Sequence, residues 1–257
     1  MSLKKASAYA AALAITTTLA ISQASALTFA SFGVTGGTRF SLTSDSFSAT
    51  ETGNFSVANA VTLPASLGGS VFAATLTLTG ALAPGTGNES TFPGASNSNL
   101  SQSLSSLSFT ITGASGAVAG KNLLSGALLI PSGNTLSANV NNTSATSTAS
   151  IGVSGSDATI GFSSDILAFQ VGSRDATFTL NNISPSVLSV KGTPIAGGIL
   201  ISNGDIQDFL ADVSANFSAT PTPTGVGAAV PEPGAFALLS GMGVSGLTFG
   251  LRARRRK

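Results

Sequence analysis

The sequence predicts an all-β fold, built as a single β-sandwich or jelly-roll-like domain with a targeting segment on each side. Short apolar runs alternate with polar residues at period two, most clearly in Thr75–Thr79 and Ser106–Thr112. This period is typical of a strand with one face in the core. The chain is rich in Ser and Thr, and its 30 glycines lie mostly at the breaks between the runs. We therefore expect many strands joined by tight turns, as in sandwiches and jelly rolls.

Residues 1–26 have the layout of a secretory signal peptide. Two lysines precede an apolar stretch over residues 8–21, and Ala24 and Ala26 then form a small-x-small cleavage site. The apolar stretch is short for a stable membrane span. We expect signal peptidase to cut after Ala26, so that the body of the protein leaves the cytoplasm.

The body, residues 27–219, contains a series of runs that we expect to be strands. They cover residues 27–34, 39–43, 54–58, 71–79, 107–112, 127–130, 149–153, 158–162, 166–171, 176–180, 187–190 and 209–217. No repeat of fixed period connects them, and one domain is the simplest division. The glycine-rich stretch 33–37 lacks the lysine and the strand-to-helix context of a phosphate-binding loop, so we interpret it as a turn.

Two segments of the body fit more than one secondary structure. Residues 206–213 have helical spacing, but residues 209–217 also alternate at period two over a longer stretch. We predict a turn through residues 203–205 that leads into a final strand. Residues 99–107 fit a short helix or a loop about equally well.

A transmembrane helix is predicted near the C-terminus, after a Pro/Thr/Gly-rich linker over residues 220–229. Residues 234–251 carry no charge. As an α-helix with about 1.5 Å per residue they span roughly 27 Å, close to the thickness of a hydrocarbon core. The basic residues after the span hold the C-terminus in the cytoplasm by the positive-inside bias, which makes the precursor a type I membrane protein. They are Arg252, Arg254, Arg255, Arg256 and Lys257.

A short polar motif, Pro231-Glu232-Pro233, directly precedes this span. The prolines keep the segment extended, the form in which a processing enzyme can grip a chain. The order of motif, apolar span and basic end in residues 230–257 resembles the PEP-CTERM sorting signal of Gram-negative and cyanobacterial surface proteins. The resemblance covers only this tail. It implies that an exosortase, an integral-membrane cysteine protease, recognises the motif, cuts near it and passes the body to the envelope or the extracellular polysaccharide.

The net charge of the whole chain, +1, hides an acidic body. Seven of the 11 basic residues lie in the two targeting segments, which leaves four basic residues against nine carboxylates in the body, a net charge near −5. A body with so few basic groups cannot neutralise a run of phosphates. Nucleic-acid binding is therefore not expected.

The residue types that are missing exclude most catalytic chemistry. The chain has no Cys, His or Trp, and its only tyrosine, Tyr9, lies in the predicted signal peptide. Ser-His-Asp and Cys-His systems, zinc sites built on His or Cys, haem and iron–sulfur ligation are thereby excluded. We expect no enzyme, no cofactor and no metal site. A hydrolase needs only two carboxylates, so close pairing of two carboxylates in a cleft would revive that class.

Calcium is the other ligand that the body's carboxylates could hold. Asp205, Asp208 and Asp212, or Asp157 with Asp165, supply oxygen ligands, but their spacing matches no known calcium loop. Solvated loop carboxylates are the simpler interpretation.

The sequence thus predicts an exported bacterial surface or extracellular-matrix protein with a structural or adhesive role. Its expected partners are the two processing enzymes, the membrane during transit, and extracellular polysaccharide. A carbohydrate- or calcium-binding module and a permanently anchored type I membrane protein remain alternatives.

Overall fold

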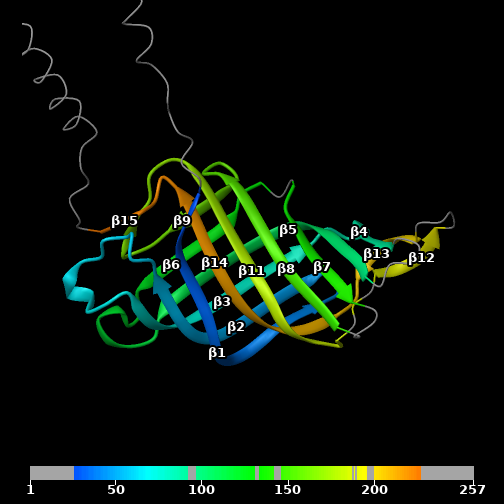
Figure 1. The fold of residues 1–257 in the computed structure, drawn as a ribbon, viewed down its shortest axis with the longest axis horizontal. Coiled ribbons are helices and arrows are strands. Elements are labelled where there is room, and N and C mark those ends of the chain that lie inside the picture. The colour runs from blue at the N-terminus through cyan, green and yellow to red at the C-terminus, as the bar shows by residue number, and fades with distance from the viewer. Residues whose placement is uncertain are drawn as a thin grey trace, which may run out of the picture.

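The computed structural model describes residues 26–91, 97–130, 133–141, 146–186, 188, 190–195 and 200–226, and strands dominate this part of the chain (Figure 1). The strands are β1 (Leu27–Thr43), β2 (Ser46–Val57), β3 (Val71–Leu82), β4 (Gly87–Thr91), β5 (Asn97–Gly113), β6 (Asn122–Leu128), β7 (Thr135–Asn141), β8 (Thr146–Ser156), β9 (Ile160–Ser163), β10 (Leu167–Ala168), β11 (Ser173–Ser184), β12 (Val190–Ile195), β13 (Leu200–Ile206), β14 (Phe209–Thr220) and β15 (Thr224–Gly225). Two short 3₁₀ helices, η1 (Ala65–Leu67) and η2 (Gly116–Val118), complete the described elements. The predicted all-β class is confirmed.

Thirteen of these strands form one antiparallel sheet that closes on itself, while β10 and β15 form a small separate pair. The order around the ring is β5-β3-β2-β1-β14-β11-β8-β7, and β5 pairs with β7 as well as with β3. β5 can do this because its first half, residues 97–103, pairs with β7 and its second half, residues 104–113, pairs with β3. Opposing walls of this one sheet therefore face each other across the core, where a sandwich would use two sheets.

Three of the eight neighbouring pairs in the ring, β1–β2, β2–β3 and β7–β8, are successive strands of the chain, and other strands lie between the partners of the remaining five. β1, β2 and β3 are successive antiparallel neighbours, and β4 continues the line of β3 along β5. β7 likewise continues the line of β6 along the other side of β5, and β14 pairs with β1. Pairing of successive strands needs only short loops to close, which costs less chain entropy.

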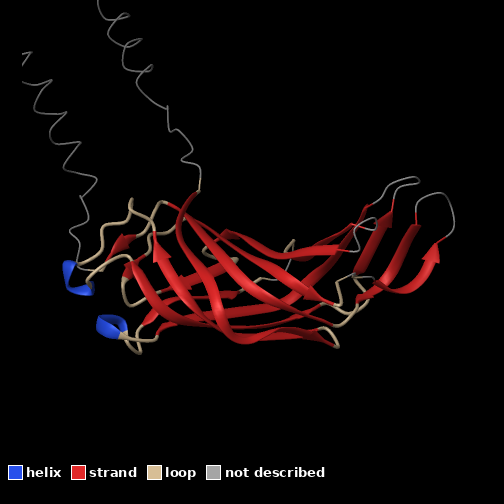
Figure 2. Cartoon of the chain, turned by 60° about the horizontal axis from the view of Figure 1, so that its bottom comes forward, coloured by secondary structure: helices blue, strands red, loops and turns tan. Residues whose placement is uncertain are grey.

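A hairpin arm extends from the ring at one end. β12 pairs with β13, and β13 pairs with β4, so the arm is a continuation of the sheet beyond the closed part. Figures 1 and 2 show this arm at the end of the molecule opposite to β15.

The core lies inside the ring and is built largely from phenylalanine. In β2, the side chains of Phe47, Ala49 and Phe55 are buried at alternating positions, while the residues between them face outward. Deeper in the ring, the Phe109 ring centroid lies 5.4 Å from that of Phe178 and 5.1 Å from that of Phe217. Such aromatic pairs bury large apolar areas, which suits a body without disulfides.

Three local predictions were wrong because strand pairing overrides the local pattern. Residues 99–107, predicted as helix or loop, lie in β5 and pair on both sides. Residues 203–205, predicted as a turn, lie in β13 between β4 and β12. The glycine-rich stretch 33–37 lies in β1 and pairs with β2, with a register shift between Val34 and Gly36. The predicted final strand over residues 209–217 is confirmed as part of β14.

The ordered body also extends past its predicted end at residue 219. Gly225 of β15 pairs with Leu167 of β10, and the Val226 amide donates to the Ile166 carbonyl at 3.0 Å. The first part of the predicted linker therefore packs on the body. The predicted transmembrane helix over residues 234–251 and the signal peptide up to residue 25 lie outside the described residues. In the described part, no helix has the length and apolar character needed to cross a membrane.

Candidate functional site

Most of the predicted sorting residues lie outside the described part of the chain. These are Ala24, Pro231, Glu232, Pro233, Arg252, Arg254, Arg255, Arg256 and Lys257. Ala26 is described and lies exposed, one residue before β1 begins.

Two of the candidate calcium ligands, Asp205 and Asp208, accept hydrogen bonds from different segments of the protein. Asp205 accepts hydrogen bonds from the Gly85 amide and the Gln102 side chain, and Asp208 accepts one from the Ser44 amide. Among the described residues, no group of three or more Asp or Glu side chains is arranged to hold a metal ion. The third carboxylate of this set, Asp212, belongs to the pocket described below.

The other candidate pair, Asp157 and Asp165, is divided between two loops. Asp157 forms an ion pair with the buried Arg174, at 2.9 Å between Oδ1 and Nη2. Asp165 accepts a hydrogen bond from the Asn122 amide at 2.8 Å. Both carboxylates fasten loops to the ring.

A glutamate occupies a core position that the sequence analysis did not single out. Glu51 lies between Ala49 and Gly53 on the inward face of β2, and only 1% of its surface is exposed. Its Oε1 accepts a hydrogen bond from the Val213 amide of β14 at 3.4 Å. The alternation of Phe47, Ala49 and Phe55 in the sequence places residue 51 inside, so this signal was available from the period alone.

Glu51 lines a pocket of about 290 Å³ together with residues from three other strands, of which Arg39 and Asp212 are charged. We call it the carboxylate pocket. Its lining residues are Val34, Thr35, Gly36, Gly37, Arg39, Glu51, Asn182 and Asp212. The bulge in β1 belongs to it, because Gly37 pairs with Glu51 and has a φ of 116°, a backbone conformation that favours glycine.

The second carboxylate of this pocket is fully engaged by its neighbours. Asp212 Oδ1 accepts from Arg39 Nε at 2.8 Å, and Asp212 Oδ2 accepts from Asn182 Nδ2 at 2.6 Å. Arg39 also donates to the Asn182 carbonyl. These contacts tie β1, β11 and β14 together at the pocket's mouth.

The two carboxyl groups have pKa values displaced in opposite directions. Burial raises the pKa of Glu51, and the nearby charge of Asp212 raises it further. Backbone hydrogen bonds to the carboxylate act in the opposite direction but do not cancel the rise. The hydrogen bond from Asn182 lowers the pKa of Asp212, with Arg39 contributing in the same direction. Opposed pKa values in one pocket are a pattern of acid–base pairs. Here, however, Glu51 is covered and both oxygens of Asp212 have partners, so the arrangement favours proton uptake by a structural group over attack on a substrate.

Replacing Glu51 with glutamine is expected to stabilise the protein in a pH-dependent way. The pKa of Glu51 is higher in the folded protein than in the unfolded chain. Its contribution to folding stability is therefore fully present below the unfolded pKa and is lost as the pH rises through the folded pKa. The glutamine amide of the E51Q variant stays neutral at every pH and avoids that loss. Thermal unfolding should therefore show a higher melting temperature for E51Q at pH 8, and the difference should shrink toward pH 4.

The variant Asp212→Asn is the matched control, with the opposite sign. The lowered pKa of Asp212 adds stability above its unfolded pKa, and this is lost as the pH falls through the folded pKa. The melting temperature of the wild type should therefore be higher than that of D212N at neutral pH, and the two values should converge in acid. A difference between wild type and E51Q that stays constant from pH 4 to pH 8 would contradict the role of Glu51.

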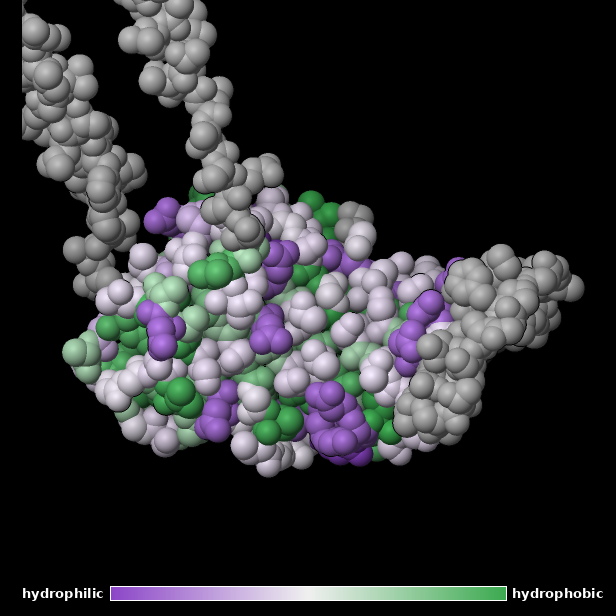
Figure 3. Space-filling model, viewed as in Figure 1, coloured by the Kyte–Doolittle hydropathy of each residue, from purple (hydrophilic) through white to green (hydrophobic). Residues whose placement is uncertain are grey.

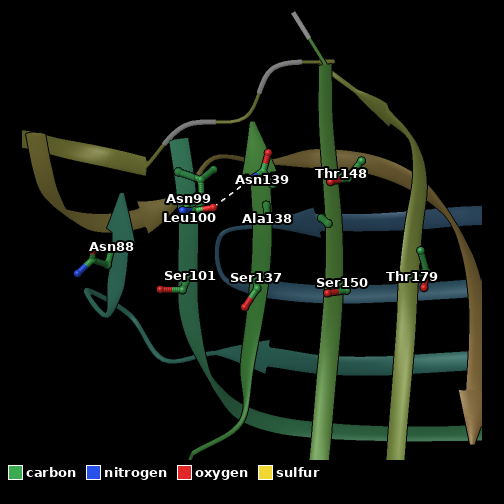
Figure 4. A pocket seen from close by; sticks show the side chains of 11 residues that line it. Asn88, Asn99, Leu100, Ser101, Ser137, Ala138, Asn139, Thr148, Ser150 and Thr179 are labelled. Carbon is green, nitrogen blue, oxygen red and sulfur yellow. Dashed lines mark hydrogen bonds between the residues drawn. The ribbon is translucent and has the colours of Figure 1, made fainter. Parts of the chain in front are cut away.

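A second concave surface lies on the outer face of the ring, across β4, β5, β7, β8 and β11 (Figure 4). We call it the outer groove. It has a volume of about 570 Å³ and is lined by Asn88, Asn99, Leu100, Ser101, Ser137, Ala138, Asn139, Thr148, Ala149, Ser150 and Thr179. None of these described residues is charged, and the exposed ones carry amides and hydroxyls. Leu100, Ala138 and Ala149 are buried and alternate with them.

The register of the strands arranges the polar side chains of the outer groove in two rows. In one row, Ser101 pairs with Ser137, Ser137 with Ser150, and Ser150 with Thr179. In the other, Asn99 pairs with Asn139 and Asn139 with Thr148. The Asn139 Nδ2 donates to Asn99 Oδ1 at 2.9 Å, the dashed line in Figure 4. β7 and the first half of β5 were not predicted as strands, so neither row was foreseen, although Leu136, Ala138 and Val140 alternate with polar residues in β7.

Comparisons with known proteins add no assignment. No protein-family model matches the sequence, and no curated protein or solved structure matches the chain. The chemistry of the chain therefore rests on its own residues.

Proposed function

We propose that the chain is an exported bacterial surface or extracellular-matrix protein, made as an inner-membrane precursor and released by an exosortase. The observation that carries the proposal is the order of Pro231-Glu232-Pro233, the uncharged residues 234–251 and the basic end. The N-terminal signal layout adds to it, since export and sorting signals at the two ends form one delivery route.

The geometry of the body supports such delivery. Ala26 is exposed directly before β1, so a cut after it removes no part of the sheet. Leu27 of β1 pairs with Ala219 of β14, which brings the two ends of the body to the same end of the ring. Signal peptidase and exosortase would thus act at one end of a folded domain.

The surface of the body supports a structural, non-enzymatic role in a hydrated matrix. On the face visible in Figure 3, residues of intermediate hydropathy cover most of the surface, and strongly hydrophilic residues are scattered. Outward hydroxyls meet across strands, as in the contacts of Thr79 with Ser108 at 2.9 Å and of Thr28 with Ser218 at 3.2 Å. Such a surface suits contact with neutral, hydroxyl-rich polymers.

Processing at the motif is expected to remove the apolar tail from the extracellular form. In a host with an exosortase, intact mass spectrometry of the protein in the medium should show a chain that begins at Leu27 and lacks residues 234–251. The double variant Glu232→Ala/Pro233→Ala should remain in the inner membrane.

The variant Pro84→Ala provides the matched control, because Pro84 is an exposed proline of the body outside the motif. It should be released like the wild type. An extracellular or surface form that still carries residues 234–251 would replace the proposal with a permanently anchored type I membrane protein.

A further inference from the structure

We propose that the outer groove binds an uncharged polysaccharide, with Asn99 and Asn139 as its central hydrogen-bonding groups. The inference deepens the function proposed above and rests on it, since an exported body would meet the polysaccharides outside the cell. It depends on the chemistry of the lining, the row geometry and the position of the groove in the ring.

The lining of the outer groove matches the chemistry of sugar hydroxyls. Within the pair of asparagines, the Asn139 amide nitrogen donates to the Asn99 amide oxygen. This orientation leaves the Asn99 amide nitrogen and the Asn139 amide oxygen to serve as donor and acceptor. A sugar hydroxyl both donates and accepts, so adjacent hydroxyls of one ring can engage both groups. Ser137 and Thr148, both exposed, add hydroxyls beside them.

The row geometry suits a linear polymer lying across the strands. The hydroxyls of Ser101, Ser137 and Ser150 occupy directly paired positions on adjacent strands. Adjacent strands are about 4.8 Å apart, which is comparable with the length of one hexose unit in an extended chain. A polymer in the groove would therefore meet a similar hydroxyl at each step.

The charge of the site favours a neutral polymer over an anionic one. The described residues that line the groove carry no charge, and the body as a whole has nine carboxylates against four basic residues. A polyanion would find no cation in the groove and a repulsive field around it. A neutral polysaccharide avoids this cost.

The groove lies apart from the place where the two ends of the body meet. The two ends of the body meet where Leu27 pairs with Ala219. The groove lies farther along the ring, near the start of β8 and the middle of β11. The groove is therefore distinct from the part of the body where Leu27 and Ala219 lie.

The test is retention of the full-length chain, held in detergent, on columns of insoluble or cross-linked polysaccharide. Cellulose, curdlan, galactomannan and dextran are the neutral probes, and alginate is the anionic one. At least one neutral polymer should retain the protein, and alginate should not. The double variant Asn99→Ala/Asn139→Ala should weaken retention about tenfold, as expected for the loss of a few neutral hydrogen bonds. The variant Ser137→Arg, which fills the middle of the groove, should abolish it.

The matched control is Thr50→Ala/Thr77→Ala, an exposed cross-strand pair on β2 and β3 outside the groove. It removes polar side chains from the same kind of surface and should bind like wild type. The proposal is overturned if no neutral polymer retains the chain or if alginate retains it best. It is also overturned if retention of this control falls as much as that of the asparagine variant. None of these results bears on export or tail removal. Failure of the binding proposal can therefore be distinguished from failure of the proposed export.

Discussion

Replacing Phe217 with alanine is expected to destabilise the body by about 3–5 kcal/mol, the usual cost of removing a buried aromatic ring. The Phe217 side chain is 0% exposed, and its ring centroid lies 5.1 Å from that of Phe109 and 6.0 Å from that of Phe178. Phe178 and Phe217 come from the paired strands β11 and β14, whereas Phe109 comes from β5, which pairs with neither of them. The cavity would therefore open between walls that the mutation cannot easily bring together.

Urea unfolding of the purified full-length chain measures this effect. Leu210→Ala is the matched control, because Leu210 lies in the same strand but is 43% exposed. F217A should shift the unfolding midpoint strongly, and L210A should shift it little. Equal shifts for the two variants would show that the packed phenylalanine side chains contribute no more to stability than the exposed Leu210. Since a domain has only about 5–15 kcal/mol to lose, F217A is also expected to lower the yield of folded protein.

The variant Gly53→Ala is expected to cost about 2–3 kcal/mol through backbone crowding. A Cβ atom at Gly53 would collide with the Gly33 carbonyl oxygen on the adjacent strand and lie 2.9 Å from Phe32 Cζ. The neighbour it meets is backbone, which cannot rotate out of the way. Relief would require β1 and β2 to separate at the bulge that forms one wall of the carboxylate pocket.

Gly33→Ala is a close control for this prediction. Gly33 is exposed on β1 opposite this part of β2, and a Cβ added there meets nothing within 4 Å. Its stability should stay within about 0.5–1 kcal/mol of wild type, with a gain expected from the lower entropy of the unfolded chain. A melting temperature for G53A equal to that of G33A would show that the two strands have room to part.

Much of the strand content could be predicted from the period of the sequence. The alternation in Thr75–Thr79 and Ser106–Thr112 places these segments in β3 and β5, and the final strand over residues 209–217 is part of β14. Among the missed strands, β4 and β13 lack a clear alternation of apolar and polar residues. Strand β7 does alternate, with Leu136, Ala138 and Val140 between polar residues, so its signal was present but was overlooked. β4 and β13 are held extended by their pairing with β5 and β12.

The functional surfaces were less predictable for the same reason. Glu51 was counted as one of nine body carboxylates, although its position between Ala49 and Gly53 marks it as inward-facing. Nothing in the sequence pairs it with Asp212, which lies 161 residues further along the chain. The pocket that they share exists only because β14 closes the ring against β1.

Composition and local pattern were enough for the class of fold, the acidic and largely uncharged character of the body, and the exclusion of chemistry that needs His or Cys. These are properties of residues and of their nearest neighbours along the chain. Ring closure, the pocket that Glu51 shares with Asp212, and the outer groove depend on which strands become neighbours in space. Ser137, Ser150 and Thr179 form one row because β7, β8 and β11 pair in register. A period of two specifies which face a residue occupies, but it carries no information about the partner strand, and that is settled by the packing of the whole sheet.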